Sequence, residues 1–285
     1  MSQDALAQLL RTPPRTTFAG VPDDVWLWLN TAGQRLCPAL EEYLPGLPNE
    51  ALQTRVVGMS GDAALGHAFN AYRVFKRLYE AHVGPIEAST TVLDFGCGWG
   101  RVLRFFLREV DPANLFGIDT NPETLQAGQA TSKWGTFQKT DRFAPSPFAE
   151  QQFDLIYAYS VFSHLSEECH AGWIAEFARI LKPGGMLVVT TWARSFIEDC
   201  ARLRAEPGAN AHADPKAFQD LEGALAAYDD GRYCFDPVYL PSFGQTCISE
   251  RYASERWMAH LDVLGFTPER GGDHQEFIVA RKRAG

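Results

Sequence analysis

A group of glycines beside a carboxylate is the feature of this sequence best suited to hold a small ligand. Asp94 is followed by Gly96, Gly98 and Gly100. Glycine has no Cβ, so it permits unusual backbone dihedrals and lets a ligand lie against the backbone at a helix N-terminus. The spacing is G-x-G-x-G, whereas a dinucleotide fingerprint has a third glycine where Arg101 stands. A carboxylate at this place repels a pyrophosphate and attracts an ammonium group.

The elements around the turn point to a nucleotide-binding sheet. Val92, Leu93 and Phe95 form a short apolar run that is typical of a strand buried on both faces. From Trp99 onward, apolar residues recur at helical spacing with Arg101, Arg104 and Arg108 between them, which predicts an amphipathic helix. Strand, glycine turn and helix open a Rossmann-type unit. A ligand with an amino group, a carboxylate and a nucleoside fits such a site, and S-adenosylmethionine has all three.

The stretch V-L-D-F-G-C-G-W-G-R-V-L-R resembles motif I of the class I S-adenosylmethionine-dependent methyltransferases. Downstream, F-D-L-I-Y, S-V-F-S-H-L and L-K-P-G-G-M-L-V-V resemble later motifs of the same family, so the likeness spans residues 91–192. It implies S-adenosylmethionine as cofactor and S-adenosylhomocysteine as product. It also implies that the turn, with Cys97 among its glycines, lines the methionine end and that Asp94 helps hold the amino group.

Asp119 is the second carboxylate in this scheme. It ends a predicted strand over residues 114–118, about twenty residues beyond the glycine turn, where a carboxylate can accept hydrogen bonds from ribose hydroxyls. Capping of the next helix is the alternative role for an aspartate here. The resemblance assigns the ribose to Asp119, with Thr120 beside it.

Four further residues complete the predicted cofactor contacts. The resemblance implies that Asp141 meets the adenine amino group, although a solvated loop aspartate is the alternative. Arg101 could pair with the methionine carboxylate, and an exposed surface arginine is the alternative. Tyr159 and Ser160 are expected to approach the methionine or the acceptor through backbone groups.

His164 is the candidate catalytic base. Methyl transfer from a sulfonium is an in-line displacement, so the protein must add alignment, a dry pocket and, for a hydroxyl acceptor, removal of a proton. An imidazole has a pKa near neutrality, and His164 follows the strand predicted over residues 153–157. The alternative is a loop histidine bonded to a backbone carbonyl. We expect transfer to an oxygen of a small molecule or sugar. N-methylation of an amine, a non-catalytic cofactor-binding subunit and, more distantly, an NAD dehydrogenase are the alternatives.

Composition excludes several other classes. The net charge is -9 and the basic residues do not cluster, which disfavours nucleic acid as a partner. The six cysteines form no C-x-x-C pair, which argues against a zinc site or a disulfide framework and suits the cytoplasm. No run has the length of a signal peptide core or a membrane span. Tyr159-Ser160 and Thr191-Trp192 supply no carboxylates after two central strands, so no metal is expected. The oligomeric state is open.

The predicted fold is a three-layer α/β/α sandwich of Rossmann-like type. Its sheet is expected to be mostly parallel and seven-stranded, with an antiparallel edge strand. Residues 1–85 are predicted to be a helical extension or lid, and residues 86–285 the methyltransferase domain, with an acceptor-side insertion at about 205–248. At the C-terminal end, a helix capped by Ser249 is expected to run past Leu264 to Gly265, followed by an antiparallel strand pair.

Overall fold

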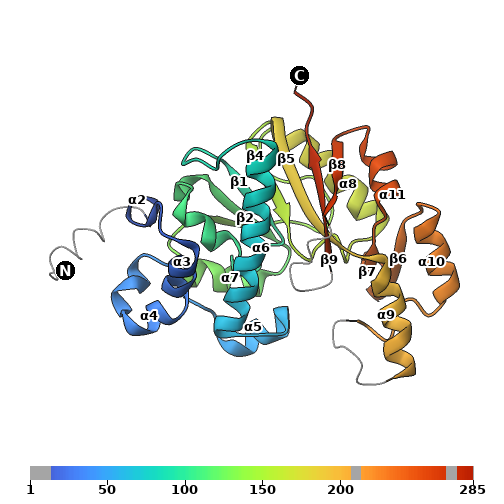
Figure 1. The fold of residues 1–285 in the computed structure, drawn as a ribbon, viewed down its shortest axis with the longest axis horizontal. Helices are drawn as coiled ribbons and strands as arrows, with labels where there is room; N and C mark the ends of the chain where they lie inside the picture. Colours follow the sequence, from blue (N-terminus) through green and yellow to red (C-terminus); the bar gives the residue numbers. More distant parts are fainter. Residues whose placement is uncertain (1–13, 207–212, 268–274, 285) are drawn as a thin grey trace. The chain divides into compact units, whose positions relative to one another are not determined.

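Parallel pairing dominates the strands of this chain. The computed structural model describes residues 14–206, 213–267 and 275–284, and within them lie nine strands with intervening helices (Figure 1). The chain divides into two units, Met1–Thr140 and Asp141–Gly285. The mostly parallel α/β fold with an antiparallel edge strand is confirmed. The predicted number of strands was two too small, because the insertion predicted at about 205–248 contains an antiparallel strand pair that was not expected there.

In the first unit, three parallel strands carry the glycine turn. They are β1 (Val92–Phe95), β2 (Leu115–Asp119) and β3 (Thr136–Lys139), in the order β3-β2-β1. All four residues of β1 are buried, as the apolar run predicts. The helices of this unit, with three 3-10 helices marked η, are α2 (Pro14–Phe18), α3 (Asp23–Asn30), α4 (Ala32–Leu36), η1 (Pro38–Glu42), α5 (Glu50–Val57), α6 (Gly61–His82), η2 (Leu103–Arg108), η3 (Pro112–Asn114) and α7 (Pro122–Thr131).

The long helix α6 buries one apolar stripe against the segment that follows the glycine turn. The ring of Phe69 meets that of Phe105 at a centroid distance of 5.0 Å, and Tyr72 meets Phe106 edge-on at the same distance. Edge-to-face aromatic pairs of this kind add to the free energy gained from burial. The residues of this stripe recur at helical spacing and are all buried, and they are Leu65, Phe69, Tyr72, Phe75 and Tyr79.

The segment after the glycine turn is not the amphipathic helix that was predicted. It forms the short 3-10 helix η2, and Arg104 within it is buried. The Arg104 guanidinium donates hydrogen bonds to the Pro45 carbonyl, to the Gly46 carbonyl at 3.2 Å and to the Asn30 side-chain oxygen at 3.2 Å. Burial lowers the Arg104 pKa to about 9. The expectation of a polar helix face failed because residues more than fifty positions away cover it.

Arg108, at the other end of η2, is also buried and bonded to residues far away in the chain. Its guanidinium donates to the Val21 carbonyl at 2.9 Å and to the Asp23 carboxylate at 2.8 Å, and the side chain is buried. The Trp26 indole N–H also donates to the Phe105 carbonyl at 3.1 Å. Helix α3, which lies near α6 in Figure 1, and the residue Val21 before it are therefore joined to η2 by buried and partly buried hydrogen bonds.

In the second unit, β5 is the strand on which the others assemble. It pairs in parallel with β4, antiparallel with β9 and, through its last residue, in parallel with β7. The edge strand β8 pairs antiparallel with β9, which confirms the predicted C-terminal pair. The elements of this unit are β4 (Phe153–Ala158), α8 (Glu167–Ile180), β5 (Leu181–Trp192), α9 (Arg194–Ala205), α10 (Leu221–Asp229), β6 (Cys234–Leu240), β7 (Phe243–Cys247), α11 (Glu250–Trp257), β8 (Asp262–Thr267) and β9 (Gln275–Arg281).

The last helix is shorter than expected. Ser249 caps α11 as predicted, since its hydroxyl accepts the Tyr252 N–H at 3.2 Å. The helix ends at Trp257, however, and Leu264 and Gly265 lie in β8. Gly265 has φ +150° at an irregularity in the β8–β9 register. Cross-strand hydrogen bonds to β9 thus replace the helical bonds that the spacing suggested.

None of the helices in the described part of the chain combines the length and the apolar character that a membrane span requires.

A neutral histidine lies in the core of the second unit. His170 is 1% exposed, and its Nε2 accepts the Trp257 indole N–H at 2.7 Å. Its Nδ1 lies 3.1 Å from the Tyr233 hydroxyl, which itself donates to the Leu165 carbonyl at 2.9 Å. Because Nε2 is an acceptor, the ring is neutral and Nδ1–H is the donor. Burial lowers the His170 pKa to about 3.

This burial predicts a loss of stability in acid. An unfolded histidine takes up a proton near its ordinary pKa of 6.5, but the folded His170 does not until about 3. Unfolding is therefore favoured as the pH falls through that window, by about 2 kcal/mol between pH 7 and pH 5 from this residue. His170→Phe should remove that share of the pH dependence, despite a cost of about 1–3 kcal/mol from the unpaired Trp257 N–H. Urea unfolding at both pH values measures it, with His260→Phe as the exposed control. If the free energy of unfolding fell by the same amount between pH 7 and pH 5 in His170→Phe and in wild type, the predicted role of His170 would be wrong.

Candidate functional site

The glycine turn in the first unit leaves open space beside its backbone. Gly96, Gly98 and Gly100 have φ values of +77°, +54° and +77°. A Cβ on Gly100 would meet the Phe137 ring at 2.7 Å, so that glycine is required by packing. A Cβ on Gly98 would meet nothing within 4 Å. The left-handed turn therefore presents free backbone surface at Gly98, as a ligand-binding turn should.

Asp119 is bonded to this turn. One carboxylate oxygen accepts the Gly98 N–H at 2.8 Å and the other accepts the Asn121 N–H at 2.8 Å. Burial raises the pKa of the Asp119 carboxyl, and these N–H donors oppose the shift. The N-cap of α7 is Asn121, whose side chain accepts the Glu123 N–H at 3.0 Å. Helix capping, the alternative role for Asp119, therefore belongs to its neighbour.

The structure brings other predicted residues of the first unit close to this carboxylate. Asp94 is buried in β1, and Cys97 is buried beside it. Burial raises the pKa of the Cys97 thiol, and the negative charges of Asp94 and Asp119 raise it further. Cys97 is therefore a neutral wall residue and not a reactive thiolate. Thr120 is exposed at the end of β2.

Arg101 has a protein contact that the sequence did not reveal. Its guanidinium lies 2.9 Å from Nδ1 of His67, a residue of α6. The side chain is half-buried, so the surface alternative describes it only in part. Its pairing with a cofactor carboxylate stays a prediction. His67 lies 34 positions away in the chain, and nothing in its local pattern marks it.

In the second unit, His164 is held by a backbone carbonyl. Its Nδ1 lies 2.8 Å from the Gly244 carbonyl, and its ring stacks on Phe243 at 5.2 Å and meets the Trp192 ring edge-on at 6.2 Å. Burial lowers the His164 pKa, while the carbonyl raises it. The bond places the proton on Nδ1, so Nε2 keeps its lone pair. The carbonyl-bonded histidine posed as the alternative thus has the tautomer that a base needs.

Ser160 occupies a constrained turn after β4. Its φ is +60°, its N–H donates to the Thr190 hydroxyl at 2.7 Å, and its own hydroxyl accepts from the Gln275 amide at 2.8 Å. The side-chain oxygen of Gln275 is buried without a hydrogen-bond partner in the part of the chain that the structure describes. Left-handed backbone outside glycine stores strain and occurs often at functional sites. The neighbouring Tyr159 stacks on Phe277 at 6.3 Å.

Two further points concern the remaining predictions. Asp141 is exposed in the loop after β3, which suits either of its two proposed roles, and its contact with adenine stays a prediction. Among the described residues, no group of three or more His, Cys, Asp or Glu side chains is arranged to hold a metal ion.

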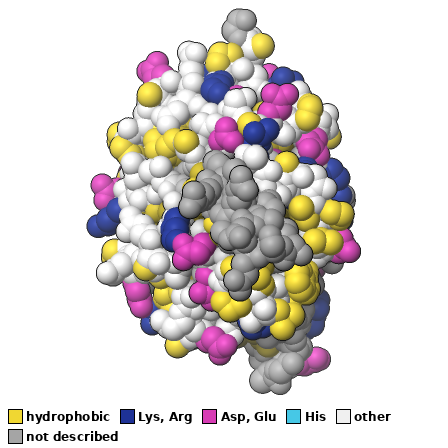
Figure 2. Space-filling view, turned by 90° about the vertical axis from the view of Figure 1, so that its left-hand side faces the viewer, with side chains coloured by type: hydrophobic (Ala, Val, Ile, Leu, Met, Phe, Trp, Pro, Cys, Tyr) yellow, Lys and Arg dark blue, Asp and Glu magenta, His cyan; other side chains and the backbone are white. Residues whose placement is uncertain are grey.

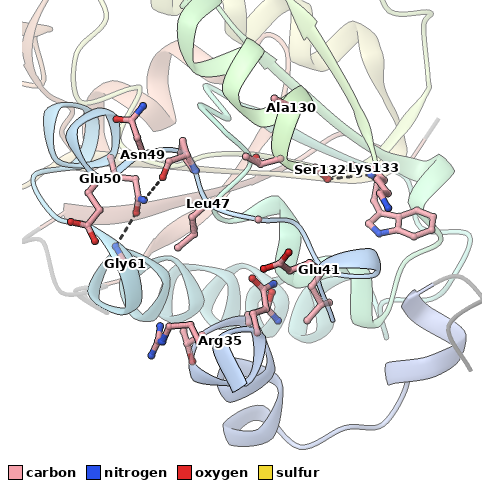
Figure 3. Close-up of a pocket in the computed structure, with 18 of the residues that line it drawn as sticks. Arg35, Glu41, Leu47, Asn49, Glu50, Gly61, Ala130, Ser132 and Lys133 are labelled. Carbon is pink, nitrogen blue, oxygen red and sulfur yellow. Dashed lines mark hydrogen bonds between the residues drawn. The ribbon is translucent and has the colours of Figure 1, made fainter. Parts of the chain in front are cut away.

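A cavity of about 670 Å³ also lies in the first unit, between its N-terminal helices and the end of α7 (Figure 3). Arg35 pairs there with Asp62 at 2.6 Å, and Lys133 pairs with Glu42 at 2.5 Å. Both cations of its lining are thus already neutralised by carboxylates. None of the predicted site residues lines this cavity.

A mostly parallel sheet, a glycine turn after one strand and a carboxylate after the next are the features of a Rossmann-like fold. Residues 92–185 match the family model described as a methyltransferase domain. A solved S-adenosylmethionine-dependent methyltransferase from Mesorhizobium loti is similar with a TM-score of 0.51 and 13% identity, over 75% of this chain and 97% of that one. At this identity the likeness shows the fold. Together these findings support a class I methyltransferase domain in the chain.

Two curated relatives have different acceptors in their names. The chain is 30% identical over 148 residues to a trans-aconitate 2-methyltransferase of Azoarcus sp. (strain BH72), covering 51% of this chain and 56% of that protein. It is 28% identical over 131 residues to a sterol 24-C-methyltransferase of Kluyveromyces lactis, covering 45% of this chain and 35% of that protein. The matches thus span little more than half of one relative and about a third of the other.

Proposed function

We propose that this protein transfers the methyl group of S-adenosylmethionine to an oxygen of a small molecule or sugar. The observation that carries the proposal is the open turn at Gly98, whose N–H is bonded to the Asp119 carboxylate at 2.8 Å. The turn leaves room for a ligand chain, and the carboxylate offers acceptors to a ribose. The residues present therefore fit this cofactor.

Each residue has a separate task in this proposal. Bound S-adenosylmethionine supplies a methyl group that is already activated by the positive sulfur. Asp94 attracts the ammonium group of the methionine end, and Asp119 accepts hydrogen bonds from the ribose. His164 accepts the proton of the acceptor hydroxyl at Nε2, while the Gly244 carbonyl holds the imidazole in the required tautomer. No other proton carrier is needed for this reaction.

The oxygen acceptor depends on His164. The names of the relatives include a carboxylic acid substrate and a carbon acceptor, so likeness alone does not choose among acceptor atoms. A neutral amine can attack a sulfonium without a base, whereas a hydroxyl benefits from one. A histidine with its Nε2 lone pair retained favours the hydroxyl. The proposal also includes the domain organisation, with a helical extension at 1–85, a methyltransferase domain at 86–285 and an insertion at about 205–248. It includes a cytoplasmic location as well.

Charge also supports a small acceptor. Figure 2 shows acidic and basic side chains interspersed over the described residues of the face in view, with no broad basic patch there. The net charge is -9. Both disfavour a polyanion such as nucleic acid, which is bound mainly through its phosphates.

The proposed function is tested by binding and by product formation. S-adenosylhomocysteine should raise the melting temperature of the purified protein, and NADH should not. Incubation with methyl-labelled S-adenosylmethionine and a metabolite extract should then label a small molecule on oxygen. Stabilisation by NADH would favour a dehydrogenase. Binding of S-adenosylhomocysteine without any labelled product would favour a non-catalytic subunit.

Gly98→Ala tests the open face of the turn. The new methyl group would enter space that holds no protein atom within 4 Å, so the fold should survive with a strain of about 1 kcal/mol from the left-handed backbone. Binding of S-adenosylhomocysteine should weaken about tenfold or more, because the methyl group occupies the ligand's side of the turn. Calorimetric titration and thermal melting measure the two effects. Gly100→Ala is the contrast, since its methyl group would strike Phe137 and lower stability instead. Unchanged affinity in Gly98→Ala would show that no ligand lies there.

A further inference from the structure

Arg142 lies next to the ring on which the candidate base stacks. Its guanidinium carbon is 5.9 Å from the centroid of the Phe243 ring, and that ring stacks on His164 at 5.2 Å. One nitrogen of the guanidinium donates to the Ser242 hydroxyl at 2.8 Å. The backbone of Arg142 is anchored as well, because its carbonyl accepts the Trp173 indole N–H at 2.8 Å. The cation is thus held in place beside the aromatic wall of His164.

Arg142 is a half-buried residue, and its guanidinium has no counter-ion among the described residues of its unit. Within residues 141–206, 213–267 and 275–284, no carboxylate lies within ion-pair distance of it. Most other arginines of this unit have a carboxylate partner, and they are Arg179, Arg194, Arg202, Arg232, Arg251 and Arg283. A guanidinium has five N–H donors in a planar fork that matches a carboxylate or phosphate, and among the described residues only one of these donors has a hydrogen-bond acceptor. The unused donors of this guanidinium are therefore available to an anion.

We propose that Arg142 binds an anionic group of the methyl acceptor, a carboxylate or a phosphate, so that the acceptor is an acidic small molecule. This inference rests on the proposed function and narrows its substrate class. The anionic end would be fixed by the fork of Arg142, and the hydroxyl to be methylated would lie at Nε2 of His164. Phe243, which contacts both side chains, separates the two ends of the acceptor site. Arg142 is therefore a specificity-determining residue.

The experiment uses the full chain with methyl-labelled S-adenosylmethionine and a metabolite extract as the source of acceptors. The labelled product should be retained on an anion exchanger, because the group bound by Arg142 is not the one methylated. Phosphatase treatment separates the two sources, since it releases a phosphate-bearing product from the exchanger but not a carboxylate. With that acceptor, Arg142→Gln should raise KM about 10- to 100-fold and change kcat by less than about threefold. The KM of Arg142→Lys should lie between those of wild type and Arg142→Gln, because lysine keeps the positive charge but lacks the planar fork of donors.

Three controls separate acceptor binding from a structural role. Arg232→Gln removes an exposed, paired arginine and should leave KM unchanged. Ser242→Ala removes only the hydrogen bond to Arg142 and should raise KM less than about threefold. The affinity of every variant for S-adenosylhomocysteine should equal that of wild type. A labelled product that is neutral or cationic, or an Arg142→Gln variant with the wild-type KM, overturns the inference and leaves the proposed function standing. Absence of S-adenosylhomocysteine binding in wild type overturns the proposed function itself.

Discussion

Replacement of Asp119 by alanine is expected to weaken binding of S-adenosylhomocysteine by about 100-fold or more. Two ribose hydroxyls would lose their common acceptor, and a hydrogen bond to a charged group is worth about 1.5–3 kcal/mol. The Gly98 N–H would also lose its partner at 2.8 Å, so the turn itself would be less well fixed. Asp119→Asn keeps one acceptor oxygen and should lose less affinity than Asp119→Ala. Isothermal titration with the three proteins gives the comparison directly.

Asn121→Ala is the matched control for this experiment. Asn121 follows the same strand and caps α7, so its loss should cost about 1 kcal/mol of stability without removing a ribose acceptor. The Asp119 variants should lose a similar or larger amount of stability, but only they should lose affinity. If Asn121→Ala weakened binding as much as Asp119→Ala, the effect would come from the helix end and not from the carboxylate.

Local patterns in the sequence were enough to predict the strand and the glycine turn at which the cofactor is proposed to bind. Buried parallel strands read as apolar runs, and a left-handed turn requires glycine, so β1 and the turn at Gly96, Gly98 and Gly100 follow from residue types alone. The position of Asp119 at the end of β2 was predictable for a similar reason, because the apolar run of the strand ends at this carboxylate. Ser249 was found as a cap for an equally local reason.

Contacts between distant segments were not predictable. Arg104 was placed on the polar side of a helix, but it is buried because the Pro45 and Gly46 carbonyls and the Asn30 side chain satisfy it. No pattern within η2 encodes those partners. The early end of α11 has a similar cause. The strand β8 forms by pairing with β9, and nothing in the sequence of β8 itself indicates that partner. Propensity gave way to tertiary hydrogen bonding in both cases.

The sequence offered His164 as a candidate base by residue type and position, but it did not predict the tautomer or the pKa shift of the imidazole. His164 could be named as a candidate because few side chains titrate near neutrality. Its tautomer depends on the Gly244 carbonyl, 80 positions away, and its lowered pKa depends on burial beside the Phe243 and Trp192 rings. These partners come from the insertion and from the end of β5. Only the folded chain shows that the carbonyl-bonded alternative and the catalytic role are compatible.

His164→Ala is therefore expected to lower kcat for an oxygen acceptor by about 100-fold or more, the usual contribution of a general base. The affinity for S-adenosylhomocysteine should stay the same, because the imidazole acts on the acceptor. His260→Ala, at an exposed position of the same unit, is the control and should keep full activity. Added imidazole should restore part of the activity of His164→Ala and none to the control.

The pH profile gives an independent measure of the same residue. Burial lowers the His164 pKa below its ordinary 6.5, so the imidazole remains neutral, and able to accept a proton, at pH values where a free histidine is already charged. The acid limb of kcat/KM should accordingly fall below pH 6.5 in wild type and be missing in His164→Ala. Nearly full turnover in that variant, with an unchanged pH profile, would remove the base from the reaction. The acceptor atom would then be one that needs no proton removed before it attacks the methyl group, such as the neutral nitrogen of an amine.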